Sequence, residues 1–319
     1  MRVLAAALVF LLATSGYARA DGPPFHVGVT RVTVQDAAPF EALIAYPTGA
    51  SEVPTPAGPF TIAATRDAPI ATGARFPIVL FSHGGNGKSE AGPLVHQALI
   101  TSLTRRGFIV IAPFHPATSR PLEDRPRQNH EALELVLNDP RFAAHADQAR
   151  LGMIGFSYGG ALTLIAAGGI PSLAHLAAYC TDRTDDPRGC GGAPKNGARV
   201  PVYGKSADVL PLKAIVLLEP FGALFDREGL QSVKLPVLLY RAEQSDLGAE
   251  GNIFALAAAL PRPPQMKATP GGHFVFVDPC PSVVEEEAPV VCKDAAGVDR
   301  ATFHKRLEAD VATFLERTL

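Results

Sequence analysis

The sequence has 319 residues, of which 47% are hydrophobic and 19% are charged. This composition is too apolar for an intrinsically disordered chain and too polar for a protein with many membrane spans. Lysine and arginine number 29 against 31 acidic residues, so the formal net charge is −2. Without a positive excess the chain has no overall field that attracts nucleic acid or an anionic membrane, and we expect neither as a partner.

The first twenty residues have the features of a secretion signal. Arg2 precedes an apolar run over residues 3–13, and Ala18 and Ala20 are small residues at the two positions that a signal peptidase reads. The run is shorter than the roughly 18 apolar residues of a membrane-spanning helix, and no later stretch is long enough to span. The sequence predicts a signal peptide over residues 1–20 and an exported protein, periplasmic or secreted.

The cysteines fit export to an oxidising compartment. The four of them form two pairs close in sequence, Cys180 with Cys190 and Cys280 with Cys292, and their spacing matches no zinc motif. We predict one disulfide in each pair, although four cysteines allow three pairings; the alternative is four buried free thiols. We expect no bound metal and no cofactor.

In chain order, the first two predicted strands form a hairpin. Apolar and polar residues alternate over residues 27–34 and 41–46, with residues 36–39 as the turn. This period of two is typical of antiparallel strands with one exposed face.

Short continuous apolar runs further along predict parallel strands that are buried on both faces. The runs cover residues 77–81, 108–111, 151–154, 214–218 and 237–240, with a shorter candidate at 265–269. Helical patterns lie between or after them, over residues 94–105, 130–137, 161–167, 253–260 and 303–315. Strands that alternate with helices predict an α/β fold, a doubly wound and mostly parallel sheet with an N-terminal antiparallel hairpin.

We expect one domain over residues 21–319. The Pro- and Gly-rich residues 47–74 are similar to a linker, but only a hairpin precedes them, and two strands cannot form an independent domain. Residues 168–212 form a long insertion between a helix and a strand. A segment of this length is usually a lid, a pocket wall or disordered.

The strongest chemical signal is a serine between glycines. Residues 155–159 read Gly-Phe-Ser-Tyr-Gly, and an apolar strand runs into this pattern while a helix of small residues follows it. Gly-x-Ser-x-Gly marks a sharp strand-to-helix turn that exposes the serine hydroxyl. We therefore predict Ser157 as a nucleophile; the alternative is a Gly-rich helix entry that binds an anion or packs tightly.

A serine nucleophile needs a base, normally a histidine. His273 is favoured among nine histidines because it lies on a loop between the candidate strand 265–269 and the final helix. His115 is the alternative, and with His83 it could line the pocket. His304 lies within the predicted C-terminal helix and is interpreted as a surface or packing residue.

The carboxylate that orients the base is open among three residues. Glu219 directly follows the strand 214–218, at the edge of the sheet where open α/β sheets keep their sites. Glu243 and Asp246 follow the next strand and are alternatives. In every case the chain order is serine, acid, histidine.

Backbone amides are expected to stabilise the negative oxygen that forms when a carbonyl is attacked. One is the amide of Tyr158, immediately after the nucleophile, and the other is that of Gly85, in the Gly-rich segment after the strand 77–81. The alternative is an ordinary Gly-rich turn, and the segment lacks a phosphate-binding Lys motif.

Four segments together resemble the α/β-hydrolase superfamily: residues 82–85 (Ser-His-Gly-Gly), 155–160 (Gly-Phe-Ser-Tyr-Gly-Gly), 218–220 (Leu-Glu-Pro) and 270–274 (Pro-Gly-Gly-His-Phe). Within it, most of residues 27–319 resemble bacterial proteins called predicted dienelactone hydrolases and platelet-activating-factor acetylhydrolases.

In the acetylhydrolases the acid occupies the place of Glu219, usually as aspartate, and this departure keeps Asp246 open. True dienelactone hydrolases have a cysteine nucleophile where this chain has Ser157. The resemblance implies a cofactor-independent carboxylic-ester hydrolase that acts on small-molecule or lipid-like esters with short or modest acyl groups. A peptidase of the same superfamily and a non-catalytic binding protein on the same scaffold are the alternatives.

Overall fold

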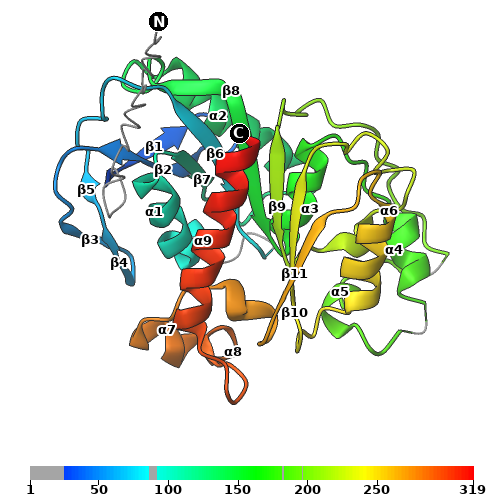
Figure 1. Cartoon of the computed structure of the whole chain (residues 1–319). Coiled ribbons are helices and arrows are strands. Elements are labelled where there is room, and N and C mark those ends of the chain that lie inside the picture. The colour runs from blue at the N-terminus through cyan, green and yellow to red at the C-terminus, as the bar shows by residue number, and fades with distance from the viewer. Residues whose placement is uncertain (1–24, 86–91, 182, 196) are drawn as a thin grey trace, which may run out of the picture.

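The computed structural model describes residues 25–85, 92–181, 183–195 and 197–319. The predicted signal peptide lies outside these residues and stays a prediction. A nine-stranded sheet in the order β11-β10-β9-β8-β6-β7-β2-β1-β5 runs through the molecule (Figure 1). Its strands are β1 (His26–Val34), β2 (Phe40–Thr48), β5 (Thr65–Arg66), β6 (Phe76–Ser82), β7 (Ile109–Pro113), β8 (Ala146–Phe156), β9 (Ala214–Leu218), β10 (Val237–Ala242) and β11 (Gln265–Thr269).

The strand directions confirm the predicted fold class. β1 pairs antiparallel with β2, and β2 pairs antiparallel with β7. β7, β6, β8, β9, β10 and β11 then run parallel to one another. Every residue of β7 and of β9 is buried, which explains why these strands are continuous apolar runs in the sequence. The sheet is therefore mixed, mostly parallel and α/β-hydrolase-like.

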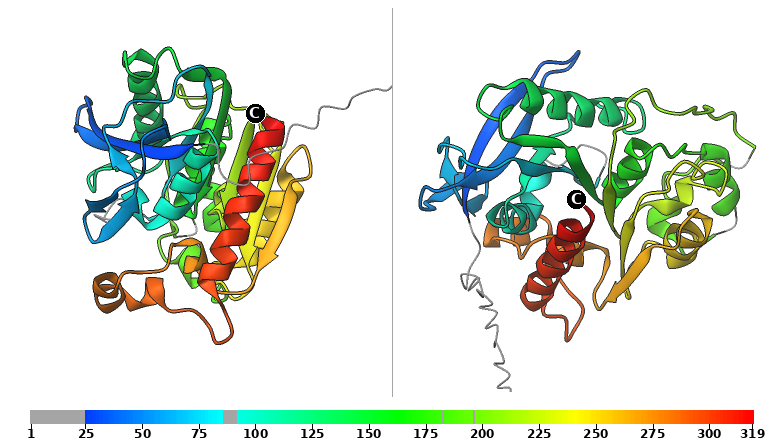
Figure 2. Two further views of the ribbon diagram at one scale, coloured as in Figure 1. Left: turned by 60° about the vertical axis from the view of Figure 1, so that its left-hand side comes forward. Right: turned by 45° about the horizontal axis from the view of Figure 1, so that its top comes forward.

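Helices cover both faces of the sheet (Figure 2) and divide the core in two. On one face α1 (Gln97–Arg105) and α9 (Arg300–Thr318) pack, and on the other lie α2 (Asp124–Asn138) and α3 (Tyr158–Ala166). The remaining helical segments are short: η1 (Gly92–His96), α4 (Leu173–Tyr179), α5 (Pro187–Cys190), η2 (Gly222–Leu224), η3 (Glu250–Phe254), α6 (Ala255–Ala259), η4 (His273–Phe276), α7 (Ser282–Glu287) and α8 (Pro289–Cys292).

The Pro- and Gly-rich stretch 47–74 contributes to the core. It contains a small antiparallel sheet of β3 (Pro54–Ala57) and β4 (Phe60–Ala63) that the sequence pattern does not predict. Phe60 and Ile62 are buried and belong to the core cluster beneath α1. The segment is thus tied to the domain by apolar packing rather than acting as a linker.

Both predicted disulfides are confirmed. Cys180–Cys190 closes a loop with a sequence separation of 10 in the insertion 168–212, between α4 and the end of α5. Cys280–Cys292 closes a loop with a sequence separation of 12 that contains α7 and α8. These bonds are consistent with an oxidising, extracellular compartment.

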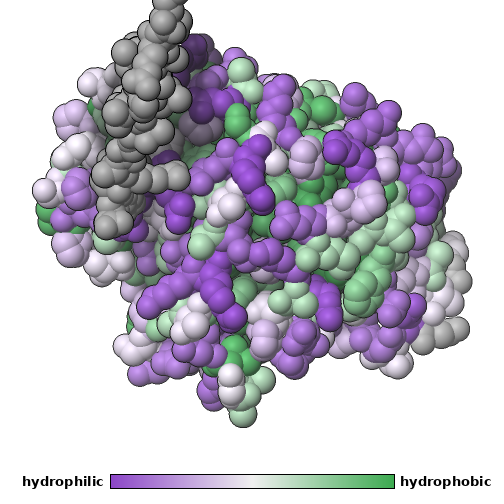
Figure 3. Space-filling model, viewed as in Figure 1, coloured by the Kyte–Doolittle hydropathy of each residue, from purple (hydrophilic) through white to green (hydrophobic). Residues whose placement is uncertain are grey.

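The surface in the view of Figure 3 is mostly hydrophilic, with hydrophobic residues gathered where Figure 1 places α6. Phe254, beside α6, has an exposed fraction of 41%. In the part of the chain that the structure describes, no helix combines the length and the apolar character that crossing a membrane requires.

Candidate active site

The serine lies at a sharp turn that only small neighbours permit. β8 ends at Phe156 and α3 begins at Tyr158, so Ser157 alone makes the reversal, with φ 54° and ψ −118°. A Cβ at Gly155 would collide with the carbonyl of Gly159, and one at Gly159 would collide with the carbonyl of Ser82. The pattern Gly-x-Ser-x-Gly is therefore a steric requirement of this turn.

Ser157 and His273 are in direct contact. His273 Nε2 lies 2.9 Å from Ser157 Oγ, although 116 positions separate the two residues in the chain. Burial is the main cause that lowers the pKa of His273 to about 3; the nearby charge of Arg188 lowers it further, and that of Asp246 acts in the opposite direction. The ring packs against Phe156, with centroids 5.0 Å apart. A neutral imidazole in this position can accept the proton of the serine hydroxyl.

Glu219 is a buried carboxylate with one unsatisfied oxygen. It directly follows β9, is 0% exposed, and accepts a hydrogen bond from the backbone N–H of Ala242 through Oε2. Oε1 has no hydrogen-bond partner, and neither does the buried Nδ1 of His273. Burial raises the pKa of Glu219 to about 7. An acceptor and a donor of complementary chemistry are thus both left unpaired at this end of the sheet.

The two alternative acids have other environments. Asp246 forms an ion pair with Arg188, with Nε–Oδ1 and Nη2–Oδ2 distances of 2.6 Å, and 51% of its side chain is exposed. Glu243 is exposed, and its backbone N–H donates to the carbonyl of Thr269. Among the residues that the structure describes, no carboxylate forms a hydrogen bond or ion pair with His273.

The two predicted amide donors border the same cavity as the serine. Tyr158 is the first residue of α3, so its N–H has no acceptor one turn earlier in that helix. Gly85 has a φ of 74°, which favours glycine. Residues 86 and 87, the rest of the predicted Gly-rich segment, lie outside the described residues.

A buried arginine that the sequence analysis missed holds this loop. Nη1 of Arg125, in α2, donates to the carbonyl of Gly85 at 2.9 Å. The side chain is 0% exposed, and burial lowers its pKa to about 10. In the sequence it lies among other charged residues of α2, where nothing distinguishes it from a solvent-facing position.

The other histidines lie behind or beside the site. His83 and His115 are buried with ring centroids 5.2 Å apart, and His115 Nδ1 is 2.7 Å from Gln128 Oε1, so the structure gives His115 no contact with the serine. His304 is buried, with Nε2 2.9 Å from the carbonyl oxygen of Val275 and Nδ1 3.3 Å from Oδ1 of Asp278. It packs beneath the turn that carries His273.

Ser157, His273, Gly85 and Tyr158 all border one cavity of about 460 Å³. Its walls are mostly apolar and come from the insertion 168–212, from the loop after β9 and from η4. The apolar side chains among them are Phe156, Leu173, Leu176, Phe221, Leu224, Leu247 and Phe274. A mostly apolar cavity with a few polar groups is typical of a small-molecule site.

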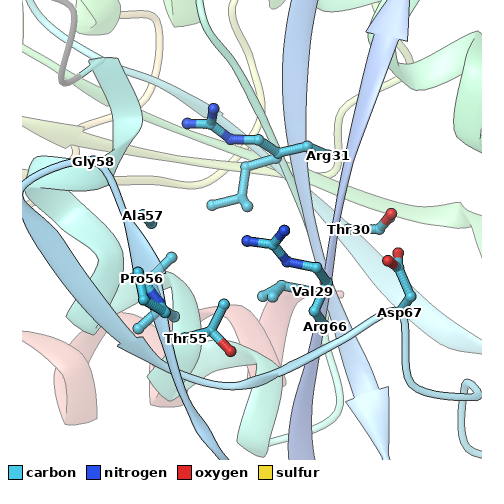
Figure 4. Close-up of a pocket in the computed structure, with 11 residues that line it drawn as sticks. Val29, Thr30, Arg31, Thr55, Pro56, Ala57, Gly58, Arg66 and Asp67 are labelled. Carbon is cyan, nitrogen blue, oxygen red and sulfur yellow. The ribbon is translucent and has the colours of Figure 1, made fainter.

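A second cavity of about 400 Å³ lies between β1 and the small β3–β4 sheet. Figure 4 shows Arg31 and Arg66 pointing into it. The residues that line it include no histidine and no cysteine, whereas both Ser157 and His273 border the first cavity, which is the candidate for chemistry. Within the described ranges, no group of three or more His, Cys, Asp or Glu residues is placed to hold a metal ion.

Comparison with known proteins supports the fold. No protein-family model and no curated protein matches the chain. Among solved structures, a ferulic acid esterase from Streptomyces cinnamoneus is similar with a TM-score of 0.60 and 21% identity, over 95% of this chain and 92% of that one. An esterase from Rhizomucor miehei is similar with a TM-score of 0.52 and 15% identity, over 94% of this chain and 84% of that one. A mutant of the esterase rPPE has a TM-score of 0.50 and 15% identity, over 92% of this chain and 83% of that one.

Proposed function

We propose that the protein is an exported serine hydrolase that cleaves carboxylic esters through an acyl-enzyme. The observation that carries the proposal is the 2.9 Å contact between Ser157 Oγ and His273 Nε2 at a strained turn that borders a cavity. A strained backbone at a serine that meets a neutral imidazole has no evident structural use. The esterase fold of the similar structures agrees with this chemistry.

In the first half of the reaction, His273 takes the proton of Ser157 while Oγ forms a bond to the ester carbonyl carbon. The amides of Gly85 and Tyr158 stabilise the oxyanion. His273 then gives its proton to the leaving alcohol as the ester C–O bond breaks. In the second half, His273 deprotonates a water molecule, whose oxygen forms a bond to the acyl carbon. The bond between this carbon and Oγ then breaks, and His273 returns the proton to Oγ, which frees the acid and Ser157.

Glu219 is the acid of this proposal. In a triad of this kind the carboxylate is buried and accepts a hydrogen bond from the second ring nitrogen of the histidine. Glu219 Oε1 and His273 Nδ1 are both buried and unpaired, and pairing them satisfies both. Asp246, by contrast, is half exposed and already paired with Arg188. We assign Asp246 the role of positioning Arg188.

The likeness of several segments to platelet-activating-factor acetylhydrolases supports short or modest acyl groups as substrates, and the cavity of about 460 Å³ fits them. A panel of p-nitrophenyl esters of increasing chain length, with peptide amides beside them, tests the proposal. We expect hydrolysis of the shorter esters that is lost in Ser157→Ala. Turnover of peptide amides alone would support the peptidase alternative, and equal rates in both proteins would overturn the proposal.

A further inference from the structure

One charged side chain borders the cavity at Ser157, and it is a cation. Of the residues that line this cavity in the described part of the chain, Arg188 alone carries a formal charge, because burial keeps His273 neutral. The protein as a whole has a net charge of −2. Arg188 is therefore the group in the described cavity lining that can attract an anionic part of a ligand by its charge.

Arg188 borders the cavity and retains N–H groups that no described residue accepts from. Two of its five N–H groups bind Asp246, through Nε and Nη2. The guanidinium carbon lies 4.8 Å from the centroid of the Phe274 ring, which fixes the plane of the group. Nη1 donates no hydrogen bond to any described residue, and 31% of the side chain is exposed. An arginine that binds one carboxylate through Nε and Nη2 can bind a second carboxylate through Nη1 and the remaining N–H of Nη2.

The short helix that carries Arg188 is held rigidly. Asp186, which is 0% exposed, caps α5 by accepting from the N–H of Gly189 at 2.8 Å. It also accepts from Asn252 Nδ2 at 2.7 Å and from Tyr179 Oη at 3.0 Å. The disulfide of Cys190 fixes the end of the same helix. Supports of this kind hold a binding group in place before the ligand arrives.

We infer that Arg188 binds a carboxylate on the substrate, so that the preferred substrates are esters that carry a carboxylate in addition to the ester group that is cleaved. The inference rests on the proposed function. The ester carbonyl lies against Ser157, and the carboxylate binds Nη1 and Nη2 of Arg188 at the other wall of the cavity. Asp246 and Phe274 hold the guanidinium in place.

The test compares two esters that differ in one charge, the monomethyl and the dimethyl ester of adipic acid, with methanol release as the readout. We expect wild type to favour the monoester by about 10- to 100-fold in kcat/KM, the range of a charge-assisted hydrogen bond. In Arg188→Gln this ratio of kcat/KM values should fall to about one, mainly because KM for the monoester rises. Arg188→Lys should give an intermediate ratio, because lysine keeps the positive charge but lacks the paired N–H groups of the planar guanidinium.

Arg183→Gln is the matched control. Arg183 belongs to the same insertion, pairs with Asp185 and lies over the ring of Tyr179 at 4.5 Å, but it does not line the cavity. Its variant should keep the wild-type ratio. A wild-type ratio near or below one, or a ratio that Arg188→Gln leaves unchanged, overturns the inference.

Binding to Ser157→Ala separates this inference from the proposed function. Calorimetry on this variant should show tighter binding of monomethyl adipate than of dimethyl adipate by about 10-fold, a difference that the added Arg188→Gln removes. Equal binding of the two esters overturns the anion site. Hydrolysis of p-nitrophenyl esters but of neither adipate ester overturns the inference and leaves the proposed function standing, whereas hydrolysis of none of these esters by wild type overturns the proposed function.

Discussion

Ser157 and Glu219, at the ends of neighbouring strands, both have a positive φ angle. Their φ angles are 54° and 45°, and only Asp67 among the other described non-glycine residues also has a positive φ. The N–H of Ser157 donates to the carbonyl of Leu218 at 3.0 Å, so the two turns are joined by the peptide that precedes Glu219. Backbone strain at two non-glycine residues that lie close together in space is typical of a functional site.

This relationship leads to a prediction on the acid. Glu219→Gln should lower kcat by about 10³- to 10⁴-fold, because an amide cannot hold the imidazole in its productive tautomer or stabilise its cation. Asp246→Asn should lower kcat for a neutral ester by less than about 10-fold, since Asp246 acts on Arg188. Steady-state kinetics on one p-nitrophenyl ester compares the two. If Asp246→Asn is the more damaging change, the acid assignment is wrong.

A second prediction concerns Arg125, which holds the carbonyl of Gly85. Arg125→Met should lower kcat by about 10- to 100-fold with little change in KM, because a loosened loop misplaces an amide that acts mainly on the transition state. Binding of a trifluoromethyl ketone, which mimics that state, should weaken in parallel. Arg127→Met, two residues further along α2, is the control. A change confined to KM would contradict this role.

The disulfides allow stability and substrate selection to be separated. Replacing both members of either pair with serine should lower the free energy of unfolding by about 3 kcal/mol, because both loops are of similar length. Only loss of the pair Cys180 and Cys190 should also reduce the preference for the anionic ester, since Arg188 lies in α5 between the N-cap Asp186 and the disulfide at Cys190. Urea unfolding and the adipate ratio measure the two effects. Equal losses of preference in both double variants would count against this arrangement.

Buried histidines predict loss of stability in acid. Burial lowers the pKa of His83 to about 4 and that of His96 and of His273 to about 3, and it holds that of His115 well below its usual value. Below a pH of about 6.5 the unfolded chain therefore binds protons that the folded protein does not, and the free energy of unfolding falls as the pH drops.

Glu219, with its pKa raised to about 7, opposes this trend, as do Asp278 and Glu308, whose pKa values burial also raises; the four histidines outnumber these three carboxyl groups. Urea midpoints measured from pH 7.5 to 4.5 should decrease steadily. His115→Gln should make the accompanying fall in the free energy of unfolding shallower by up to about 1.4 kcal/mol per pH unit. Midpoints that stay constant over this range would contradict the burial of neutral imidazoles.

The fold was predictable because its signals are local. Apolar runs mark the strands buried on both faces, and the change of period after residue 46 marks the passage from hairpin to parallel sheet. The turn at Ser157 was visible because it requires glycines at fixed positions. β3 and β4 were not, since Pro54 and Pro56 disfavour strands by propensity and only the packing of Phe60 and Ile62 offsets this.

The site was predictable in part, and the unpredicted part depends on distant contacts. His273 could be proposed from its place after the last strand. No sequence pattern pointed to Arg188, because its importance comes from a cavity formed by six separate segments of the chain. The sequence also could not decide between Glu219 and Asp246, because both follow strands at the same edge of the sheet. They differ in burial and in the partner that each acquires on folding, which only the structure shows.

The most direct test of the central claim is covalent labelling with a fluorophosphonate probe, which phosphonylates activated serines. Mass spectrometry of the mature protein should show one adduct per chain, located on Ser157, and labelling and ester hydrolysis should both disappear in Ser157→Ala. Labelling or hydrolysis that persists at the wild-type rate in this variant would place the nucleophile elsewhere and contradict the account.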